Sequence, residues 1–320
     1  MYLNQIRKEH DFLENMNSTA RQCAYDGLIQ GFSNISKIGT KYPRCKSKKN
    51  TVQSYKVKDS VKIIRGKLKL PKMKNTIKIK YSRKINGKIR SATITNNNGK
   101  YFVSINVTKS VIKSKKKTSK SVGIDLGIKE VITTSDGYKS GKILLEELDN
   151  KIARAHQKLS NRKQSGKNWQ KAKTKLNNLY SKKRNIILDK LHKITTKIIT
   201  EYDKIFVGNI QSKFTLKNKH LAKSTTDSHL FEIKRQLKYK SKWYDKEYKE
   251  INEKYTSKNC STCNHIFDKL KLNTRKWICP ICKVEHDRDI NVAINIQTVG
   301  TTVTAFSKTN NIVSVLGISH

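Results

Sequence analysis

Four cysteines in the last quarter of the chain have the spacing of a metal site. Two CxxC pairs are separated by fifteen residues. Zn²⁺ binds four thiolates in a tetrahedron, and the tight turn of each CxxC supplies two of them. Two disulfides are the alternative, but no secretory signal peptide is recognisable, and Cys23 and Cys45 follow no regular spacing. The sequence therefore predicts one structural Zn²⁺. Its ligands are Cys260, Cys263, Cys279 and Cys282.

Two aspartates are candidates for a second kind of metal site. Asp125 lies between Ile124 and Leu126 in an apolar segment, where a carboxylate needs a cation, an arginine or hydrogen-bond donors. Asp289 follows the last cysteine by seven residues, in the run HDRDINVAINI. It could instead cap a helix or pair with Arg288. Both interpretations of Asp289 stay open from the residues alone.

Taken together, the two aspartates favour divalent cations. Hard cations such as Mg²⁺ prefer carboxylate oxygens. Two such cations about 4 Å apart can activate a water and stabilise the leaving oxygen in phosphodiester hydrolysis. Beside the cysteine site and the large positive charge of the chain, the pair therefore favours a divalent-metal site that could support such chemistry.

The composition points to a polyanionic partner. The 320 residues include 69 Lys+Arg against 24 Asp+Glu, a net charge of +45, and 35% are apolar, enough for two or three small domains. Nucleic acid is the expected partner, with binding that weakens as salt rises. A lysine-rich coding bias would explain some lysines but not the shortage of acids.

No apolar run approaches the roughly 20 residues that span a bilayer, so we expect a soluble, intracellular protein without a membrane partner.

The first third of the chain changes from a helical to a strand pattern. Residues 1–40 are predicted helical, interrupted by Gly27, Gly31 and Gly39, and 42–49 (YPRCKSKK) resembles a phosphate-contacting loop. Apolar and polar residues then alternate up to about residue 108, with Asn-Gly turns between segments, which predicts an antiparallel sheet or small barrel. The clearest strands are 77–81, 88–95 and 101–107.

The remaining residues predict a mixed α/β domain. A hairpin at 121–137 would hold Asp125, and a helix beginning at Asp289 would close the domain. Between them we expect helices over 142–160, 168–200 and about 227–248, and strands over 204–210 and 251–255. Aromatics at 243, 244 and 248 are predicted to pack in the core rather than to stack on bases. Trp277 should pack the ribbon core, and His286 is not needed as a zinc ligand.

Three segments resemble the sequence blocks of the RuvC-like nuclease domain in TnpB proteins, transposon-encoded relatives of type V CRISPR effectors. These are GIDLGIK, YTSKNCSTC and DRDINVAINI. YPRCKSKK is also similar to the family's FPRFKSKK, so the resemblance covers the chain from about residue 20. It implies an RNase H-like fold, an omega-type guide RNA encoded near the transposon end, and Mg²⁺-dependent cleavage of target DNA beside a short flanking motif. Asp125 matches the first catalytic aspartate and Asp289 the last.

The segment at 207–210, between the first two of these blocks, departs from the family pattern. Where TnpB proteins commonly carry glutamate, in a form like VEDL, this chain has VGNI with Gly208. Either the site is inactive or another carboxylate replaces the missing one. Glu253 is the best substitute, resembling the arrangement in Fanzor proteins, the eukaryotic and giant-virus relatives; Glu250 and Glu232 are weaker alternatives. Structurally, Glu253 could instead be an exposed strand-end residue paired with a lysine.

The resemblance also sets expected domains and a fold class. The class is α/β multidomain: an RNase H-like (RuvC) nuclease domain with an inserted zinc ribbon, preceded by an antiparallel β-barrel (wedge) domain and a small helical recognition segment. Met1 begins almost within that segment, so the barrel is expected to be incomplete or the start truncated. The expected boundaries are recognition segment 1–45, barrel 46–112, linker 113–120, nuclease 121–255 and 286–300, zinc ribbon 256–285 contacting target nucleic acid, and tail 301–320.

The resulting hypothesis is an RNA-guided DNA endonuclease. Asp125, Glu253 and Asp289 would hold two Mg²⁺ ions, and the protein would act as a monomeric ribonucleoprotein in the cytoplasm or nucleoid of a prokaryote, or in the nucleus if the source is eukaryotic or viral. A nuclease-inactive, RNA-guided DNA-binding protein is the alternative that Gly208 keeps open. A DNA-joining transposase is weaker, because the chain lacks the catalytic tyrosine and histidine-pair signature of the partner transposases.

Overall fold

A computed structural model describes most of the chain. The chain divides into two compact units, Met1–Val111 and Ile112–His320, which are described separately. Side chains are described as far as residue 304. The described residues are 10–13, 16–47, 52–97, 99–108, 117–209, 229–252, 258–268, 270 and 274–315.

The N-terminal unit begins with one long helix. A short 3₁₀ turn (Asp11–Leu13) precedes α2 (Ser18–Ile38). The Asn17 side chain accepts hydrogen bonds from two N–H groups of the first turn, and Gly39 ends the helix in the left-handed conformation at φ 64°. Gly27 and Gly31 lie inside α2, so the predicted helix is confirmed over residues 18–38.

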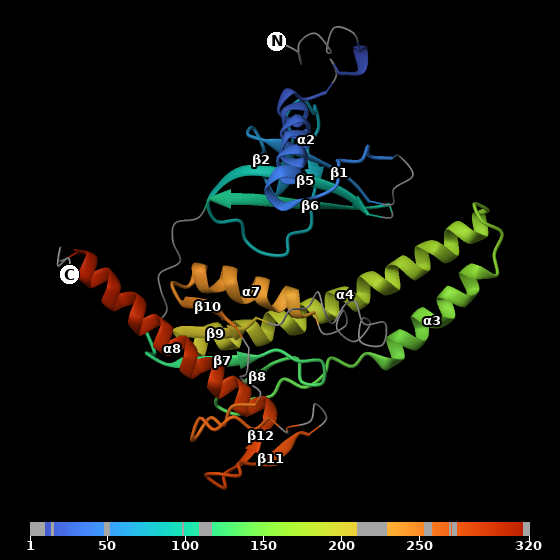
Figure 1. Ribbon diagram of the computed structural model, residues 1–320. Coiled ribbons are helices and arrows are strands. Elements are labelled where there is room, and N and C mark those ends of the chain that lie inside the picture. Colours follow the sequence, from blue (N-terminus) through green and yellow to red (C-terminus); the bar gives the residue numbers. More distant parts are fainter. Residues whose placement is uncertain are drawn as a thin grey trace. The chain divides into compact units, whose positions relative to one another are not determined.

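Two three-stranded antiparallel sheets complete this unit (Figure 1). The sheet β1-β5-β6 consists of Val52–Lys58, Lys88–Asn97 and Lys100–Thr108. The sheet β2-β3-β4 consists of Lys62–Ile64, Lys67–Lys69 and Ile77–Lys78. The predicted antiparallel pairing is confirmed; closure into a barrel stays a prediction. Their shared core is small, with Val57, Leu68, Leu70 and Ala92 among its buried residues.

The C-terminal unit is built on a mixed sheet ordered β10-β9-β7-β8. Strands β7 (Ser121–Asp125), β9 (Lys204–Gly208) and β10 (Glu247–Ile251) run parallel, and the short β8 (Thr133–Thr134) forms the predicted hairpin with β7. Strand β10 ends at Ile251, the first residue of the strand expected at 251–255, and residues 253–255 lie outside the described residues.

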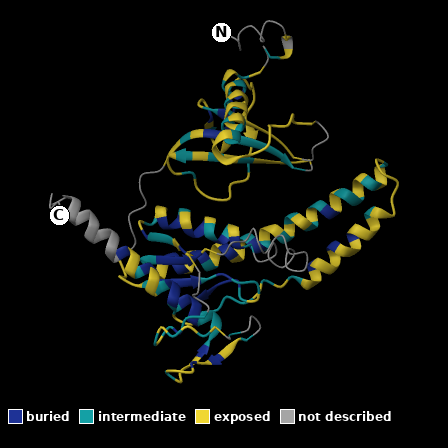
Figure 2. Cartoon of the chain, in the orientation of Figure 1, coloured by how far each residue is buried: buried dark blue, intermediate teal, exposed yellow. Residues whose placement is uncertain are grey.

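Helices cover both faces of this sheet (Figures 1 and 2). Ile205 and Val207 of β9 belong to the core that also contains α4 (Lys167–Glu201) and α7 (Leu230–Trp243). Phe206, between them, packs instead with residues of α8 (Arg288–Val315). Since neighbouring strand residues face opposite ways, α4 and α7 cover one face and α8 the other. The remaining helix, α3 (Glu146–Ser160), packs along α4.

Helix α7 ends earlier than predicted. Tyr244 and Asp245 form a turn after Trp243, with Asp245 at φ 53°, and the chain then enters β10. Tyr244 and Tyr248 pack against the core as expected, but from a turn and a strand instead of a helical stripe. Trp243 is 55% exposed, so its predicted core position is wrong.

Helix α8 lies unusually close to β7. A Cβ on Gly123 would lie 1.9 Å from the Ala293 carbonyl oxygen and 2.6 Å from the Gln297 nitrogen. The Gln297 amide donates to the Ser121 carbonyl at 2.9 Å. Later residues of α8 thus contact earlier residues of β7, so the two elements run in opposite directions.

Within the part of the chain that the structure describes, no helix combines the length and apolar character that a membrane span requires.

Candidate functional site

The three parallel strands end together at one edge of the sheet. Ile124 of β7 pairs with Val207 of β9, so Asp125 lies beside Gly208 in the next register position. On its other side, Gly208 pairs with Ile251 of β10. The prediction that the strand ahead of the ribbon lies beside the strand of Gly208 is confirmed. Glu253, two residues beyond Ile251, lies outside the described residues.

Asp125 faces the α8 side of the sheet. Gly123, two residues earlier in β7, has its Cβ direction toward Ala293 of α8. Because alternate strand residues share a face, Asp125 lies on this same side. Asp289 lies one helical turn before Ala293, and α8 runs opposite to β7. The helix therefore carries Asp289 toward the end of β7 that holds Asp125.

Asp289 is not the cap of this helix. The Oδ1 atom of Asp287 accepts hydrogen bonds from the backbone N–H groups of Asp289 (3.1 Å) and Ile290 (3.2 Å). The interpretation of Asp289 as a helix cap is therefore wrong, and the capping is done two residues earlier. The carboxylate of Asp289 is left to interact with other groups.

Lys139 holds the capping aspartate from the sheet side. Its Nζ lies 2.6 Å from Oδ2 of Asp287. Burial favours the neutral acid, but the Lys139 ammonium and the backbone donors outweigh it and lower the pKa of Asp287 below its ordinary value. The first turn of α8 is thus fixed to the β8 hairpin, because Lys139 forms a β-bridge with Thr133.

The partner of Asp289 is Arg275, which the sequence analysis missed. Its Nη1 lies 3.0 Å from both carboxylate oxygens. The ribbon positions this arginine: the Arg275 carbonyl accepts from the Arg288 N–H at 2.8 Å. The sequence left open a pairing of Asp289 with Arg288. The observed partner lies fourteen residues earlier in the chain, and no spacing in the sequence signals this pair.

The two weaker carboxylate alternatives face other groups. Glu232 pairs with Arg235 at 2.8 Å, and this hydrogen bond is the main reason why the pKa of Glu232 falls to about 2. Glu250 lies 3.5 Å from Lys234 and accepts from Tyr248 at 3.2 Å. Its neighbour Ile251 packs on the α8 side. Alternation therefore turns Glu250 to the opposite face from Asp125.

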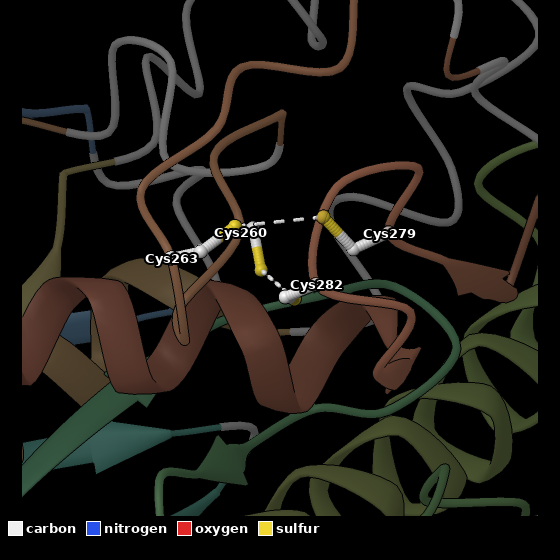
Figure 3. Close-up of side chains that lie close together, drawn as sticks. All are labelled: Cys260, Cys263, Cys279 and Cys282. Atoms are coloured by element: carbon white, nitrogen blue, oxygen red, sulfur yellow. Dashed lines mark hydrogen bonds between the residues drawn. The ribbon is translucent and has the colours of Figure 1, made fainter.

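The four cysteines of the ribbon form one cluster (Figure 3). Their sulfur atoms all lie within 4.8 Å of one another, and the pairs Cys260–Cys282 and Cys263–Cys279 are each separated by 3.6 Å. A tetrahedral Zn²⁺ with bonds of about 2.3 Å needs sulfur separations of about 3.8 Å. The donor set fits zinc. All four are free thiols, so the disulfide alternative is wrong.

The surroundings of the cluster favour the thiolate at Cys279, whereas the neighbouring sulfur atoms raise the pKa of Cys282. Burial opposes ionisation of Cys279, but the backbone N–H groups of Cys282 and Ile281 lower its pKa to about 6. His286 Nε2 lies 3.1 Å from the Cys260 sulfur, so this histidine neighbours the ligands without being needed among them. Trp277 packs with Cys260 and Cys279 in the ribbon core, as predicted.

Helix α8 links the cysteine cluster to Asp289. Asn291 accepts from the N–H of Ser261 at 2.9 Å and donates to the Asn259 carbonyl at 2.8 Å. Asn295, one turn later, donates to the same carbonyl at 2.7 Å. Both amides are buried. One helix therefore carries the candidate catalytic carboxylate and the anchor of the first CxxC turn.

Two family models and several relatives match this chain. Family models match at residues 104–219, described as "Probable transposase", and at residues 231–296, described as "Cas12f1-like, TNB domain". A relative from Streptomyces pristinaespiralis, named "Putative RNA-guided DNA endonuclease", is 32% identical over 93% of this chain and 75% of its own length. The Escherichia coli K12 protein named "Putative RNA-guided DNA endonuclease InsQ" is 26% identical over 93% of this chain and 78% of its own.

A solved structure shares the fold. A chain of the Cas12f1–sgRNA–target DNA complex superposes with a TM-score of 0.56 at 14% identity, covering 88% of this chain and 71% of the other. At that identity the likeness concerns the fold alone, and it supports an α/β architecture of this kind for the present chain.

Proposed function

Because the chain belongs to the TnpB family, we propose that it is an RNA-guided DNA endonuclease that hydrolyses phosphodiester bonds in target DNA. The observation that carries the proposal is the placement of Asp125 and the first turn of α8 at one end and on one face of the sheet. A carboxylate pair there suits a divalent cation better than a purely structural role.

Asp125, Asp289 and Glu253 are the proposed ligands of two Mg²⁺ ions. When bound, the ions would supply Lewis acidity at the reacting phosphate and lower the pKa of water. Asp125 fits because β7 fixes its backbone next to the helix that carries Asp289. Glu253 follows Ile251 by two residues, the spacing that returns an extended chain to the same face, and Gly208 offers no carboxylate of its own.

The protein groups around the proposed ions have separate tasks. Asp287 and Lys139 fix the first turn of α8, and thereby the backbone of Asp289. Arg275 neutralises Asp289 and orients its carboxylate. The proposed zinc ion in the ribbon is structural, since four thiolates leave no open position for substrate.

Guide and target recognition would be divided between RNA and protein. Base pairing of a guide RNA with the target strand supplies sequence specificity, while the protein binds backbones through its positive charge. The net charge of +45 supports this division. We propose a single protein chain bound to one guide RNA as the active particle.

The test is cleavage of matched DNA by the protein purified with its co-expressed RNA. We expect cutting only with Mg²⁺, and its loss in Asp125→Asn, Asp289→Asn and Glu253→Gln. Glu250→Gln is the matched control, because Glu250 belongs to β10 but faces away from Asp125. Full cutting by Glu253→Gln would remove this residue from the site.

A nuclease-inactive DNA-binding protein is the second candidate, favoured by the glycine at position 208. It predicts tight, RNA-dependent binding of matched DNA with no cutting at any Mg²⁺ concentration. The same preparation therefore decides between the two candidates.

A further inference from the structure

A basic groove of about 570 Å³ lies between α3 and α4, away from the sheet edge that holds Asp125. Two helical stripes form its walls. The stripe of α3 and its following turn supplies four cations, and that of α4 supplies two. These are Lys151, Arg154, Lys158 and Arg162 on the first wall, and Lys171 and Lys175 on the second.

The cations recur at intervals of three or four residues, so each wall presents about one positive charge per helical turn, or one every ~5.4 Å. Ala155, Ala172 and Leu179 also line the groove. The small alanines leave room between the two helices, and the long basic side chains extend from exposed positions. This arrangement repeats positive charge along a line, as a phosphodiester backbone repeats negative charge.

The opposite edge of the same helix pair is closed. Lys183 forms an ion pair with Asp149 at 2.7 Å, and His156 hydrogen-bonds the Tyr180 hydroxyl at 2.6 Å. On the groove edge, none of the six cations pairs with a carboxylate anywhere in the described part of the chain. Six uncompensated positive charges in one groove repel one another, and an external polyanion would relieve that repulsion.

The lining favours a folded strand over an extended single one. Proteins that hold single strands stack bases on aromatic rings, and the described residues lining this groove include no aromatic side chain. They do include Asn168, whose amide can both donate and accept a hydrogen bond. A 2′-hydroxyl also does both, and base-paired RNA is bound through its phosphates and 2′-hydroxyls.

We infer that the α3–α4 groove binds the backbone of a base-paired RNA segment, with the six cations on phosphates and Asn168 on a 2′-hydroxyl. The identity of that RNA as the guide rests on the proposed function. The groove itself requires no cleavage and no Mg²⁺, so binding and cutting can fail independently.

The test compares two neutralised variants of the full chain. The groove variant carries Arg154→Gln, Lys158→Gln and Lys175→Gln. The control carries Lys163→Gln, Arg184→Gln and Lys190→Gln, three exposed cations of α4 and of the turn before it that do not line the groove. Both variants lose the same charge. The probes are an RNA hairpin and a DNA hairpin of the same sequence, titrated without Mg²⁺ over a range of salt concentrations.

For the groove variant we expect RNA affinity to fall by roughly tenfold at moderate salt, and the slope of log K against log salt to become shallower by about 2 to 3. For the control variant, the slope of log K against log salt should differ from the wild-type slope by no more than about 1. Asn168→Ala should lower affinity for the RNA hairpin more than for the DNA hairpin. Thermal melting of each variant verifies that it is folded.

Equal slopes for the groove and control variants would overturn the groove as a binding site. Loss of affinity for the DNA hairpin alone would overturn its assignment to RNA. If the wild-type protein cuts DNA and the groove variant binds RNA as tightly as the wild type, this inference is refuted and the proposed function stands.

Discussion

Arg275 contacts both carboxylate oxygens of Asp289 with a single nitrogen, at 3.0 Å each. The arginine precedes the ribbon strand β11 (Lys276–Ile278), and the aspartate is in the first turn of α8. The ribbon therefore places a positive charge directly against the proposed Mg²⁺ ligand. A cation that binds Asp289 must compete with this guanidinium.

Replacing Arg275 should therefore tighten metal binding. Arg275→Ala removes the competing ion pair, which is 46% exposed on the arginine side, and partly exposed pairs contribute about 0.2–1 kcal/mol. We expect the dissociation constant for Mn²⁺ to fall by roughly 1.5- to 5-fold in calorimetric titration. Lys276→Ala, which removes the exposed pair with Glu285 in the same ribbon, should leave it unchanged. Weaker Mn²⁺ binding by Arg275→Ala would show that the arginine supports the metal instead.

The amide of Asn291 should couple the ribbon to α8. Asn291→Ala leaves the Ser261 N–H without its acceptor and removes one of two donors to the Asn259 carbonyl. Losing buried partners of this kind costs about 1–3 kcal/mol. We expect faster release of zinc to a colorimetric chelator and a lower melting temperature.

Thr298→Ala, on the exposed side of the same helix, removes only a bond to the backbone of its own helix and is the control. If both variants release zinc at the wild-type rate, the amide does not hold the ribbon.

The sequence predicts local features of this protein well. The cysteine cluster follows from two CxxC turns, and the strand of Asp125 from an apolar run. Contacts between residues far apart in the sequence could not be predicted. Lys139 reaches Asp287 across 148 residues, and nothing in either segment signals the pair.

Helix α7 shows a different limit. Tyr244 and Tyr248 fit a helical stripe continuing from Leu237, and both do pack on the core. The chain reaches these positions through a turn at Asp245 and the alternation of β10. The helical period and the strand alternation both bring the two tyrosines to one side. The pattern of apolar residues therefore could not locate the end of the helix.

Two glycine substitutions should change stability in opposite directions. A Cβ on Gly123 would lie 1.9 Å from a backbone oxygen of α8, which cannot move without separating the helix from β7. We expect Gly123→Ala to destabilise the C-terminal unit by about 3 kcal/mol or more. A Cβ on Gly27, inside α2, meets nothing within 4 Å. Gly27→Ala should stabilise that helix by about 0.5–1 kcal/mol.

Hydrogen exchange resolves the two effects, because it reports protection separately for α2 and for β7. Unchanged exchange in β7 of Gly123→Ala would mean that α8 does not approach the strand this closely.

Lys240 should make stability rise with pH in the alkaline range. Lys240 is 5% exposed, and its ammonium donates to the His192 carbonyl and to the hydroxyls of Thr195 and Thr196. Burial nevertheless lowers its pKa from 10.5 to about 8. Between these two values the unfolded chain binds more protons at Lys240 than the folded chain does. The free energy of unfolding therefore increases with pH across this window.

Lys240→Met removes the titrating group and keeps most of the buried volume. Denaturant unfolding at several pH values between about 8 and 10.5 should give a flatter profile for this variant than for the wild type. Lys238→Met, an exposed lysine of the same helix, should keep the wild-type profile. The variant should also be at least as stable as the wild type below the window, where the wild type keeps a buried charge. Parallel profiles for wild type and Lys240→Met would mean that the three oxygen acceptors hold the pKa of Lys240 near its ordinary value.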